Sequence, residues 1–448
     1  MAILHYTIGL PPERNGGSVQ YAYGLMSEQA KTSKVYALLC GDTLFRGSIC
    51  KIKDNGIRNG ITTFKLTNPL TPTLIYGASN PQSQHRNVKM DYDNIRKFVK
   101  EKDIKVMHLH TLMGIHKDVV AFIKGLGVTI VYTSHDFHGI CAHYNLIDFN
   151  GNPCGDNSAD RCALCNANEP SDMYLRLANS SLYHFVKKVG IHSFITKSKP
   201  TVDTKLNVSN DIEINNVKTK NYKDLIDYYK DYFKLIDKFH FNSSQTRDVF
   251  RQFLPDVDGK VIPVITSGIR DKRRPMRQSK NVRFGFIGSL NEYKGFPMLK
   301  KVVMELYTEG YDNFSIYAYP GNIVGKDDDC PLIEYRPPYK YCEISDVIYD
   351  LDCVIIPSKW YETFSLVALE GLAHGRPVIV SDHVGAKDII ASYNKELIFS
   401  TETELKQLMM RAIDNPDFLI AENKKILTSN WDFSIEKHTK EIIAFYNQ

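Results

Sequence analysis

The stretch Pro357-Ser358-Lys359-Trp360-Tyr361-Glu362-Thr363-Phe364-Ser365-Leu366-Val367-Ala368-Leu369-Glu370-Gly371 decides the fold. It follows the apolar run Cys353 to Ile356 and precedes a second apolar run, Pro377 to Val380. The pattern predicts a buried strand, a turn, a helix from about Ser365 to His374, and another buried strand. Alternation of strands and helices is typical of an α/β protein with a parallel sheet.

The predicted helix start favours a phosphate ligand. The backbone N–H groups of residues 364–366 have no partner inside the helix, and the helix dipole adds positive charge there, so a diphosphate is the natural occupant. Helical side chains lean towards the N-terminus, which brings the Glu370 carboxylate towards ligand hydroxyls beside that phosphate. Glu362 would face the other end of the ligand, and two such acceptors suit a nucleotide sugar. The alternative is a capped surface helix with solvated glutamates.

A second loop of this kind lies upstream, in Arg283-Phe284-Gly285-Phe286-Ile287-Gly288-Ser289-Leu290-Asn291-Glu292-Tyr293-Lys294-Gly295. A short apolar strand ends at Gly288, and the loop carries Lys294 before a helix begins near Phe296. Glycine lets the backbone approach a ligand closely, and the lysine places an ammonium beside a bound phosphate.

With Gly-x-Leu-x-x-x-Lys-Gly at 288–295 and Pro-Ser-x-x-x-Glu-x7-Glu at 357–370, the chain resembles the retaining glycosyltransferases of the GT4 family. The resemblance covers essentially the whole chain. It implies an α/β protein with the GT-B fold, in which two doubly wound Rossmann-like domains face each other across a cleft. It also implies a UDP- or GDP-sugar donor and transfer to an acceptor hydroxyl with retention at the anomeric carbon.

The resemblance implies roles for single residues. Glu370 would bind the nucleotide ribose, Glu362 the donor sugar and Lys294 the diphosphate, and no cofactor would be required because Lys294 and the helix N-terminus stabilise the leaving group. One position departs from the family, since Ser289 stands where an arginine usually shares the diphosphate, and Arg283 or Arg270 would have to replace it. The expected donor-binding residues are Gly16, Gly17, Gly288, Ser289, Lys294, Glu362, Phe364, Ser365, Leu366 and Glu370.

Length and composition favour two domains. The chain has 448 residues, too many for one compact core, and 43% of them are hydrophobic, enough for two. The basic segment 270–280 is expected to be a linker before the second β-α-β series. We therefore expect an N-terminal acceptor-side domain over 1–268, a donor-binding domain over 269–432, and a C-terminal helix over 433–448, which in the family crosses back to the first domain.

The N-terminal half alternates apolar strands with helical patterns, which predicts a doubly wound parallel sheet. Its first strand, Ile3 to Ile8, leads into Gly16-Gly17 and a helix from about Val19 to Ala30. This loop is not Gly-x-Gly-x-x-Gly, which disfavours a dinucleotide site. Paired glycines still permit close approach to a phosphate or sugar, and a plain tight turn is the alternative.

Two later strand ends carry histidines, in Met107-His108-Leu109-His110-Thr111 and Thr133-Ser134-His135-Asp136-Phe137. Ligands of such a sheet bind at the carboxyl ends of its strands, so several histidines there favour a site over isolated structural groups. The resemblance places His110 near the transferred sugar, as a catalytic residue together with Lys294 and Glu362. It places His135 and Asp136 on the acceptor side.

Four cysteines fall within residues 137–172, where no secondary structure is expected: Cys141, Cys154, Cys162 and Cys165. A long loop of this kind needs something to order it, and four thiolates around a tetrahedral zinc ion would do so. The resemblance agrees, because a subset of the family carries a cysteine-rich insert here. Reduced buried thiols, an iron–sulfur cluster and disulfides are the alternatives.

The remaining features concern localisation. The net charge of +5 is too small for a nucleic-acid protein, and no run of about eighteen apolar residues or signal peptide is found, so a cytoplasmic protein is expected. Residues 175–199 mix apolar side chains with lysines, which indicates either a buried helix and strand (Ser193 to Thr196) or peripheral contact with anionic lipid at the inner face of the membrane. Residues 201–235 form a polar insert, helical from Tyr222, and Asp327–Asp329 are expected to be solvated.

The sequence thus predicts a retaining glycosyltransferase acting on a glycan or lipid-linked saccharide, in bacterial surface polysaccharide biosynthesis. Two alternatives stay open: a nucleotide-sugar 2-epimerase on a similar fold, and a non-catalytic regulatory subunit.

Overall fold

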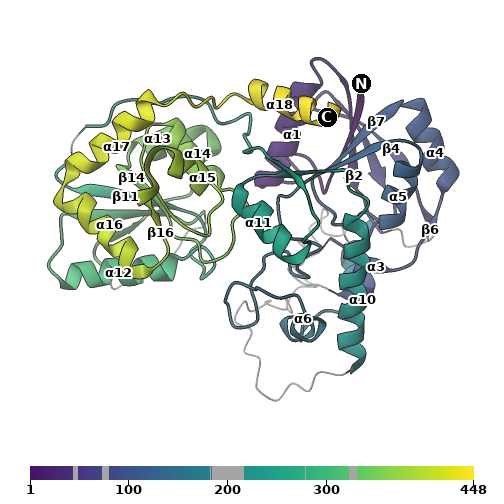
Figure 1. Cartoon of the computed structure of the whole chain (residues 1–448), viewed down its shortest axis with the longest axis horizontal. Helices are drawn as coiled ribbons and strands as arrows, with labels where there is room; N and C mark the ends of the chain where they lie inside the picture. Colours follow the sequence, from purple (N-terminus) through teal and green to yellow (C-terminus); the bar gives the residue numbers. More distant parts are fainter. Residues whose placement is uncertain (44–48, 73–79, 182, 184–215, 278, 322–329) are drawn as a thin grey trace. The chain divides into compact units, whose positions relative to one another are not determined.

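The computed structural model describes residues 1–43, 49–72, 80–181, 183, 216–277, 279–321 and 330–448 (Figure 1). The chain forms two compact units. Unit 1 comprises Met1–Phe241, Arg247–Ile262 and His438–Gln448, and unit 2 comprises Asn242–Thr246 and Pro263–Lys437. The strand expected at 193–196 and the Asp327–Asp329 run lie outside the described residues.

Unit 1 is built on an eight-stranded sheet in the order β10-β9-β8-β7-β1-β2-β5-β4. All neighbouring strands are parallel except β4 and β5. The central strands are buried along nearly their whole length, as expected when helices cover both faces of a parallel sheet. Its strands are β1 (Ala2–Thr7), β2 (Lys34–Cys40), β4 (Ile52–Arg58), β5 (Ile61–Leu66), β7 (Ile104–Leu109), β8 (Thr129–Thr133), β9 (Lys238–Phe241) and β10 (Gly259–Val261), with the separate pair β3 (Ile49–Cys50) and β6 (Lys89–Met90).

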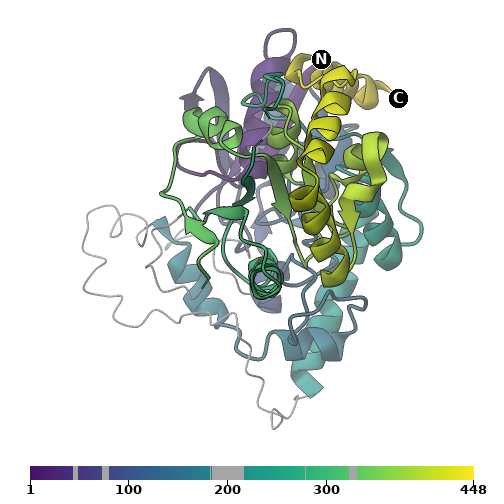
Figure 2. The ribbon, with the colours of Figure 1, turned by 90° about the vertical axis from the view of Figure 1, so that its left-hand side faces the viewer.

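Helices precede and follow these strands, and both chain termini belong to unit 1, where the two views place them close together (Figures 1 and 2). The last helix packs on the first through hydrogen bonds from Tyr21 to His438 and from Gln29 to Tyr446. The helices are α1 (Gly17–Gln29), α3 (Pro81–His85), α4 (Tyr92–Glu101), α5 (Lys117–Gly125), α6 (Ala159–Cys165), α7 (Asp172–Ala178), α10 (Asn216–Phe233), α11 (Ser244–Phe253) and α18 (Ile435–Asn447).

Two expectations for unit 1 are corrected. Residues 137–172 are not without secondary structure, because α6 forms there and carries the last two cysteines at helical spacing. The helical part of the polar insert begins at Asn216 rather than Tyr222, since α10 extends to pack on α6 and α3 and so gains tertiary support for its polar first turns.

Unit 2 has a six-stranded, fully parallel sheet in the order β13-β12-β11-β14-β15-β16. Every residue of β14 and β15 is buried, as their unbroken apolar sequences predict. The elements are β11 (Val282–Ile287), α12 (Phe296–Thr308), β12 (Phe314–Tyr319), β13 (Ile333–Tyr335), α13 (Ile344–Tyr349), β14 (Cys353–Ile356), α14 (Leu366–Ala373), β15 (Val378–Ser381), α15 (Lys387–Asn394), β16 (Ile398–Phe399), α16 (Glu402–Asp414) and α17 (Pro416–Thr428).

In each sheet the order of the strands reverses once. The reversal lies between β1 and β7 in unit 1 and between β11 and β14 in unit 2. Connections leave to opposite sides at such a point, so a crevice opens outside the carboxyl ends of the two strands, and ligands of open α/β sheets bind there. A ligand-binding site is therefore expected among the loops that follow these four strands.

Candidate functional site

The two phosphate-loop segments of the sequence meet at the strand reversal of unit 2. Residues 288–295 follow β11, residues 357–365 follow β14, and these strands are neighbours. The backbone N–H of Lys359 donates to the carbonyl of Tyr293 at 2.9 Å, and the rings of Tyr293 and Trp360 stack with centroids 6.2 Å apart. Two loops far apart in the sequence thus form one surface.

Gly295 explains how closely these loops approach. Its φ of +74° lies in the left-handed region, and a Cβ built on it would sit 1.7 Å from the carbonyl oxygen of Pro357. No side chain larger than hydrogen fits there without moving a backbone. The glycine is therefore required for the contact between the loops.

Lys294 and Glu362 form an ion pair inside this surface. The Lys294 ammonium lies 2.7 Å from Glu362 Oε1, the Ser358 hydroxyl donates to the same oxygen, and Glu362 is only 9% exposed. Burial favours the protonated acid, but the charge of Lys294 and the hydrogen bonds from Lys294, Ser358 and Trp360 outweigh it and hold the pKa of Glu362 below its usual value. The carboxylate is thus kept ionised, and the ammonium retains further N–H donors for a ligand.

The start of α14 presents unpaired backbone donors beside this pair. Ser365, the residue before the helix, has φ 102° and ψ 101°, and its side chain makes no capping hydrogen bond. Such strained backbone costs about 1–3 kcal/mol and persists only where its surroundings fix it. Here the carbonyl of Phe364 accepts from Ala386, and that of Glu362 accepts from Gly385.

Glu370 lies one and a half turns into α14 and is 7% exposed. Burial raises the pKa of its carboxyl group to about 7, partly offset by a hydrogen bond from Tyr341. Tyr339 and Tyr341 stand close enough for Glu370 to raise their own pKa values after burial does so. These two tyrosines were not predicted from the sequence; Tyr339 precedes and Tyr341 begins a short 3-10 helix, Tyr341–Glu343.

The other expected donor-binding residues differ in their surroundings. Gly288 has φ 158°, and a Cβ there would meet only Phe286, at 3.9 Å, so the space above the backbone is open; Ser289 next to it is exposed. Arg283 cannot replace the missing arginine, because it lies near the amino end of β11, where its guanidinium pairs with Asp350 at 2.8 Å and Asp352 at 3.2 Å. The expectation for Arg283 is therefore wrong, whereas Arg270 is exposed.

In unit 1 the expected residues gather at the reversal between β1 and β7. Gly16 (φ 138°) and Gly17 are exposed at the start of α1, and a Cβ on Gly16 would meet nothing within 4 Å. His110 directly follows β7, and its backbone N–H donates to Tyr6 of β1 at 3.0 Å. His110 is 2% exposed, and burial, with neighbouring imidazoles, holds its pKa well below the usual value.

His135 and Asp136 follow β8, the next strand. The His135 ring stacks on His110 with centroids 5.6 Å apart, and His135 Nε2 lies 3.4 Å from His110 Nδ1. Burial lowers the pKa of His135 to about 3 and raises that of Asp136 to about 6. Asp136 accepts a hydrogen bond from the backbone of His138 at 2.9 Å. The side chains of His110 and His135 therefore lie in contact, while Asp136 also orders its own loop.

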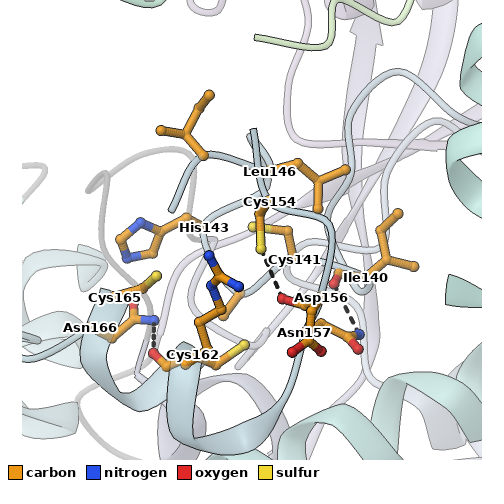
Figure 3. A pocket seen from close by; sticks show the side chains of 13 residues that line it. Ile140, Cys141, His143, Leu146, Cys154, Asp156, Asn157, Cys162, Cys165 and Asn166 are labelled. Carbon is orange, nitrogen blue, oxygen red and sulfur yellow. Dashed lines mark hydrogen bonds between the residues drawn. The ribbon is translucent and has the colours of Figure 1, made fainter. Parts of the chain in front are cut away.

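The four cysteines line one small cavity of about 20 Å³ (Figure 3). Cys141 and Cys154 come from the loop before α6, and Cys162 and Cys165 from α6 itself, with His143 beside them. All four thiols are free, and burial raises the pKa of each, that of Cys165 to about 12. Cys154 donates to the carbonyl of Asp156 at 2.8 Å. The sulfurs share a cavity but are spread around it.

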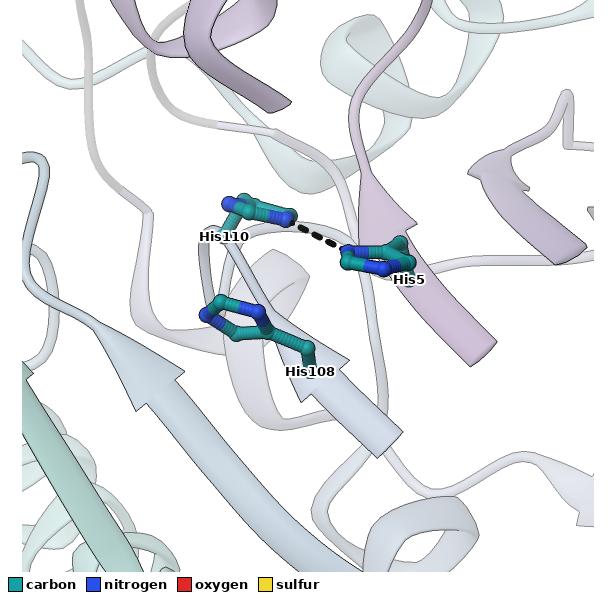
Figure 4. A group of neighbouring side chains, drawn as sticks. All are labelled: His5, His108 and His110. Carbon is teal, nitrogen blue, oxygen red and sulfur yellow. Dashed lines mark hydrogen bonds between the residues drawn. The ribbon is translucent and has the colours of Figure 1, made fainter. Parts of the chain in front are cut away.

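A tighter group of metal-ligand atoms was not expected from the sequence. Within the described ranges, one set of three or more histidine, cysteine or acidic residues has all its ligand atoms within 4.8 Å of one another: His5, His108 and His110 (Figure 4). His5 and His108 stand opposite each other on β1 and β7. The pairing of β1 with β7 brings His5 and His108 together. In the sequence, the only sign of this was one histidine in each of two strongly apolar strands.

Comparison with known proteins agrees with this geometry. The family described as Glycosyl transferases group 1 matches residues 281–415, which hold both unit 2 loops and Glu370. No curated protein sequence matches the chain.

Solved structures resemble the chain over its full length. Sucrose-phosphate synthase from Thermosynechococcus elongatus has a TM-score of 0.55 at 11% identity, covering 100% of this chain and 98% of that one. An E. coli structure described as trehalose-6-phosphate bound with UDP-2-fluoro glucose has a TM-score of 0.55 at 13% identity, covering 100% and 99%. HepE from Anabaena, in complex with UDP and glucose, has a TM-score of 0.51 at 13% identity, covering 99% of each chain. At such identities the similarity establishes the fold, which is GT-B.

None of the helices in the described part of the chain has the length and hydrophobicity that crossing a bilayer requires. Residues 281–415 thus match the Glycosyl transferases group 1 family, and the chain has the GT-B fold.

Proposed function

We propose that this protein is a retaining, GT4-type glycosyltransferase that moves a sugar from a UDP- or GDP-sugar to a hydroxyl of a glycan or lipid-linked saccharide. The observation that carries the proposal is the surface of unit 2. There the Lys294–Glu362 ion pair, the free N–H groups of α14 and the Glu370 carboxyl group stand at one strand reversal inside a glycosyltransferase group 1 domain. Structural neighbours described with UDP, UDP-glucose or UDP-2-fluoro glucose support a nucleotide-sugar donor.

In this proposal the leaving diphosphate is held by Lys294 and the N–H groups at 364–366. As the bond between the anomeric carbon and the phosphate oxygen breaks, negative charge grows on the diphosphate, and donors already fixed in place stabilise it most. Glu362 orients Lys294 and accepts from donor-sugar hydroxyls, and Glu370 accepts from the ribose hydroxyls. As the resemblance implies, His110 is proposed to contact the transferred sugar, and His135 and Asp136 to contact the acceptor.

The proposed acceptor group is a saccharide hydroxyl. A role in bacterial surface polysaccharide synthesis would bring the protein to the inner face of the membrane, in peripheral contact with anionic lipid. Within the segment 175–199 proposed for that contact, residues 182 and 184–199 lie outside the described residues.

The test is mass-spectrometric detection of sugar transfer and free nucleotide, with a panel of UDP-, GDP- and ADP-sugars, with and without a membrane lipid extract. Donor-selective, extract-dependent transfer with retained anomeric configuration is expected. Conversion of the donor sugar without any acceptor would instead identify an epimerase, and donor binding without turnover under any condition would identify a non-catalytic subunit.

Single substitutions tie the activity to the site. Lys294→Ala should lower kcat roughly 10²- to 10³-fold, the usual loss when one transition-state donor is removed. Lys301→Ala is the matched control, because Lys301 lies on α12 in the same unit and pairs with exposed Glu402. Equal activity of both variants would overturn the assignment of Lys294.

We further propose that Cys141, Cys154, Cys162 and Cys165 hold a structural zinc ion. Four thiols around one cavity supply the donor set that tetrahedral zinc prefers. Zinc ligation by Cys154 would replace its hydrogen bond to the Asp156 carbonyl. The ion would order the segment after β8 and take no part in sugar transfer.

Elemental analysis of purified protein checks the zinc proposal. One zinc per chain is expected, lost in Cys162→Ser and Cys165→Ser but kept in Cys342→Ser, whose exposed cysteine belongs to unit 2. Metal removal with a chelator should lower the unfolding temperature of unit 1. A wild-type protein free of zinc and iron after preparation in zinc-containing medium would leave reduced thiols as the correct interpretation.

A further inference from the structure

A continuous chain of hydrogen bonds crosses the interior of unit 1 beneath His110. It joins seven buried side chains from four neighbouring strands, two helices and the loop after β7, and it ends at a backbone carbonyl. Figure 4 shows three of its imidazoles. The members in order are His110, His5, Gln29, Tyr446, His108, Thr133 and His240, followed by the Ile262 carbonyl.

The carbonyl end gives the chain a direction. A carbonyl oxygen only accepts, so His240 Nε2 carries the hydrogen of its 2.7 Å bond to Ile262. Burial lowers the pKa of His240 to about 4, so the ring is neutral near pH 7 and its Nδ1 must accept, from the Thr133 hydroxyl at 2.8 Å. The Thr133 hydrogen is then used, and its oxygen accepts from His108 Nε2 at 2.6 Å.

The direction of the hydrogen bonds continues through α18 and α1. With Nε2 protonated, neutral His108 accepts at Nδ1 from the Tyr446 hydroxyl of α18, at 2.6 Å. The Tyr446 oxygen accepts from Gln29 Nε2 of α1 at 3.2 Å, and Gln29 Oε1 accepts from His5 Nε2 at 2.8 Å. An amide has a distinct donor end and acceptor end, and here its orientation agrees with the direction set at Ile262.

The chain then reaches the site. His5 Nδ1 is left as an acceptor, so His110 Nε2 donates to it, at 3.0 Å. His110 is neutral, which leaves its Nδ1 as a lone pair facing His135 Nε2 at 3.4 Å. In the reverse direction, His240 Nε2 would carry no hydrogen, and the Ile262 carbonyl opposite it cannot donate one.

We infer that this chain fixes His110 as the Nε2–H tautomer and that His5, Gln29, Tyr446, His108, Thr133 and His240 are positioning residues for it. At the carboxyl ends of β7 and β8, an acceptor nitrogen of His110 then stands beside the Nε2–H donor of His135. A hydroxyl group that entered between the two nitrogens would replace their 3.4 Å contact, accepting from His135 Nε2 and donating to His110 Nδ1, so the pair matches a neutral hydroxyl ligand. Only this last use of the pair rests on the proposed function.

Two other uses of the histidines do not fit. A proton relay would have to pass through Gln29, whose amide does not release and regain protons as an imidazole does. A metal at His5, His108 and His110 would need one lone pair from each ring. Each lone pair already accepts a hydrogen bond: that of His5 from His110, that of His108 from Tyr446, and that of His110 from His135. The chain therefore orients groups and does not conduct protons.

Nitrogen-15 NMR of histidine-labelled full-length protein reads the tautomers directly, without any donor or acceptor. The expected wild-type result at pH 7.5 is a neutral Nε2–H ring for His5, His108, His110, His135 and His240. A neutral Nδ1–H ring or a charged ring at any of the four imidazoles of the chain, His5, His108, His110 or His240, would overturn the inference.

Two substitutions break the chain without changing its shape. Thr133→Val removes the hydroxyl link to Ile262, so His5 and His110 should populate the Nδ1–H tautomer, and Thr133→Ser, which keeps the hydroxyl, should behave as wild type. Tyr446→Phe should leave His108 and His240 unchanged while loosening His5 and His110. If both breaks leave the His110 tautomer as in wild type, the inference fails.

Activity provides a separate readout. Once a donor is known, Thr133→Val should lower kcat roughly two- to tenfold, the effect of one misdirected neutral hydrogen bond, and Thr133→Ser should restore it. Correct tautomers without any transferase activity would count against the proposed function alone.

Discussion

At the scale of single residues, Glu370 holds a carboxyl group whose pKa of about 7 lies near neutrality because the side chain is buried. A group whose pKa is raised in this way is protonated below pH 7, and a protonated carboxyl group no longer offers two acceptor oxygens to a pair of hydroxyls.

We therefore expect nucleotide affinity to depend on pH. The Kd for UDP or GDP, measured by calorimetry between pH 8 and pH 6, should rise by up to about tenfold per pH unit below 7. Glu370→Gln should bind more weakly and show only the residual slope that comes from ionisation of the ligand phosphate. An equal slope in the two proteins would mean that Glu370 does not face the ligand.

The candidate donor-site residues could be proposed from the sequence, but the ion pair between two of them could not. Lys294 was expected beside the diphosphate and Glu362 beside the sugar, and in the structure the two form one partly buried ion pair. The reason is electrostatic, since a carboxylate that is 9% exposed needs a compensating charge, and strand order brings the lysine loop next to it. The chemical type of each residue can be read from the sequence, but the distance between the two side chains cannot.

At the scale of elements, the contact between the loops after β11 and β14 depends on Gly295. Gly295→Ala should detach the loops, because its Cβ would overlap the Pro357 carbonyl and the backbone would be strained as well.

Gly310→Ala provides the matched control. Gly310 also has a positive φ, of 92°, but a Cβ there meets nothing within 4 Å, so only the backbone penalty of about 1 kcal/mol applies. Thermal unfolding of unit 2 followed by tryptophan fluorescence should show a clearly larger loss for Gly295→Ala, accompanied by loss of UDP binding. Equal losses in both variants would mean that the close approach does not hold the loops.

Most strands and the helices after them were predictable from unbroken apolar runs and helical periods, as for β14, α14 and β15. Short helices were harder, because α6 owes its stability to packing on α10, far along the chain. The histidine chain was out of reach for a related reason. His5 and His240 sit in apolar strands where a single polar residue carries little signal, and only the register of four strands reveals their common face.

At the scale of the whole molecule, unit 1 contains several buried histidines that are neutral near pH 7. Burial holds the pKa of His5, His116 and His240 near 4 and that of His135, His138 and His438 near 3. In the unfolded chain these groups titrate near 6.5, so below that pH the unfolded state binds more protons and unit 1 loses stability as pH falls towards 4. Asp136 acts in the opposite sense, because its raised pKa lets the folded state bind a proton between about 6 and 3.8.

The histidines outnumber this carboxyl group, and each net proton contributes a slope of about 1.4 kcal/mol per pH unit. Unfolding of unit 1 by urea should therefore become steeply easier between pH 6.5 and 4. Both tryptophans of the chain, Trp360 and Trp431, belong to unit 2, so tyrosine absorbance and histidine NMR signals follow unit 1 while tryptophan fluorescence follows unit 2. Identical acid sensitivity of the two signals would contradict this account.

The presence of two α/β units was predictable from length and alternation, and the GT-B fold from the two loop motifs. The points where the chain passes between units are less visible in the sequence. The sequence analysis divided the chain at 268/269, and the units divide at 262/263, with 242–246 also belonging to unit 2. The segments where the chain passes from one unit to the other are short and do not differ in composition from their neighbours. Only the tertiary contacts therefore show where they lie.

The order in which these units can be completed differs from their order along the chain. Unit 1 takes its last segment, His438–Gln448, from beyond all of unit 2, and Tyr446 there fills a place in the buried histidine chain. During synthesis on the ribosome, residues 263–437 therefore have every strand of their sheet before unit 1 can close over its own. Unit 1, whose synthesis begins first, thus receives its last helical segment only after unit 2 has been synthesised.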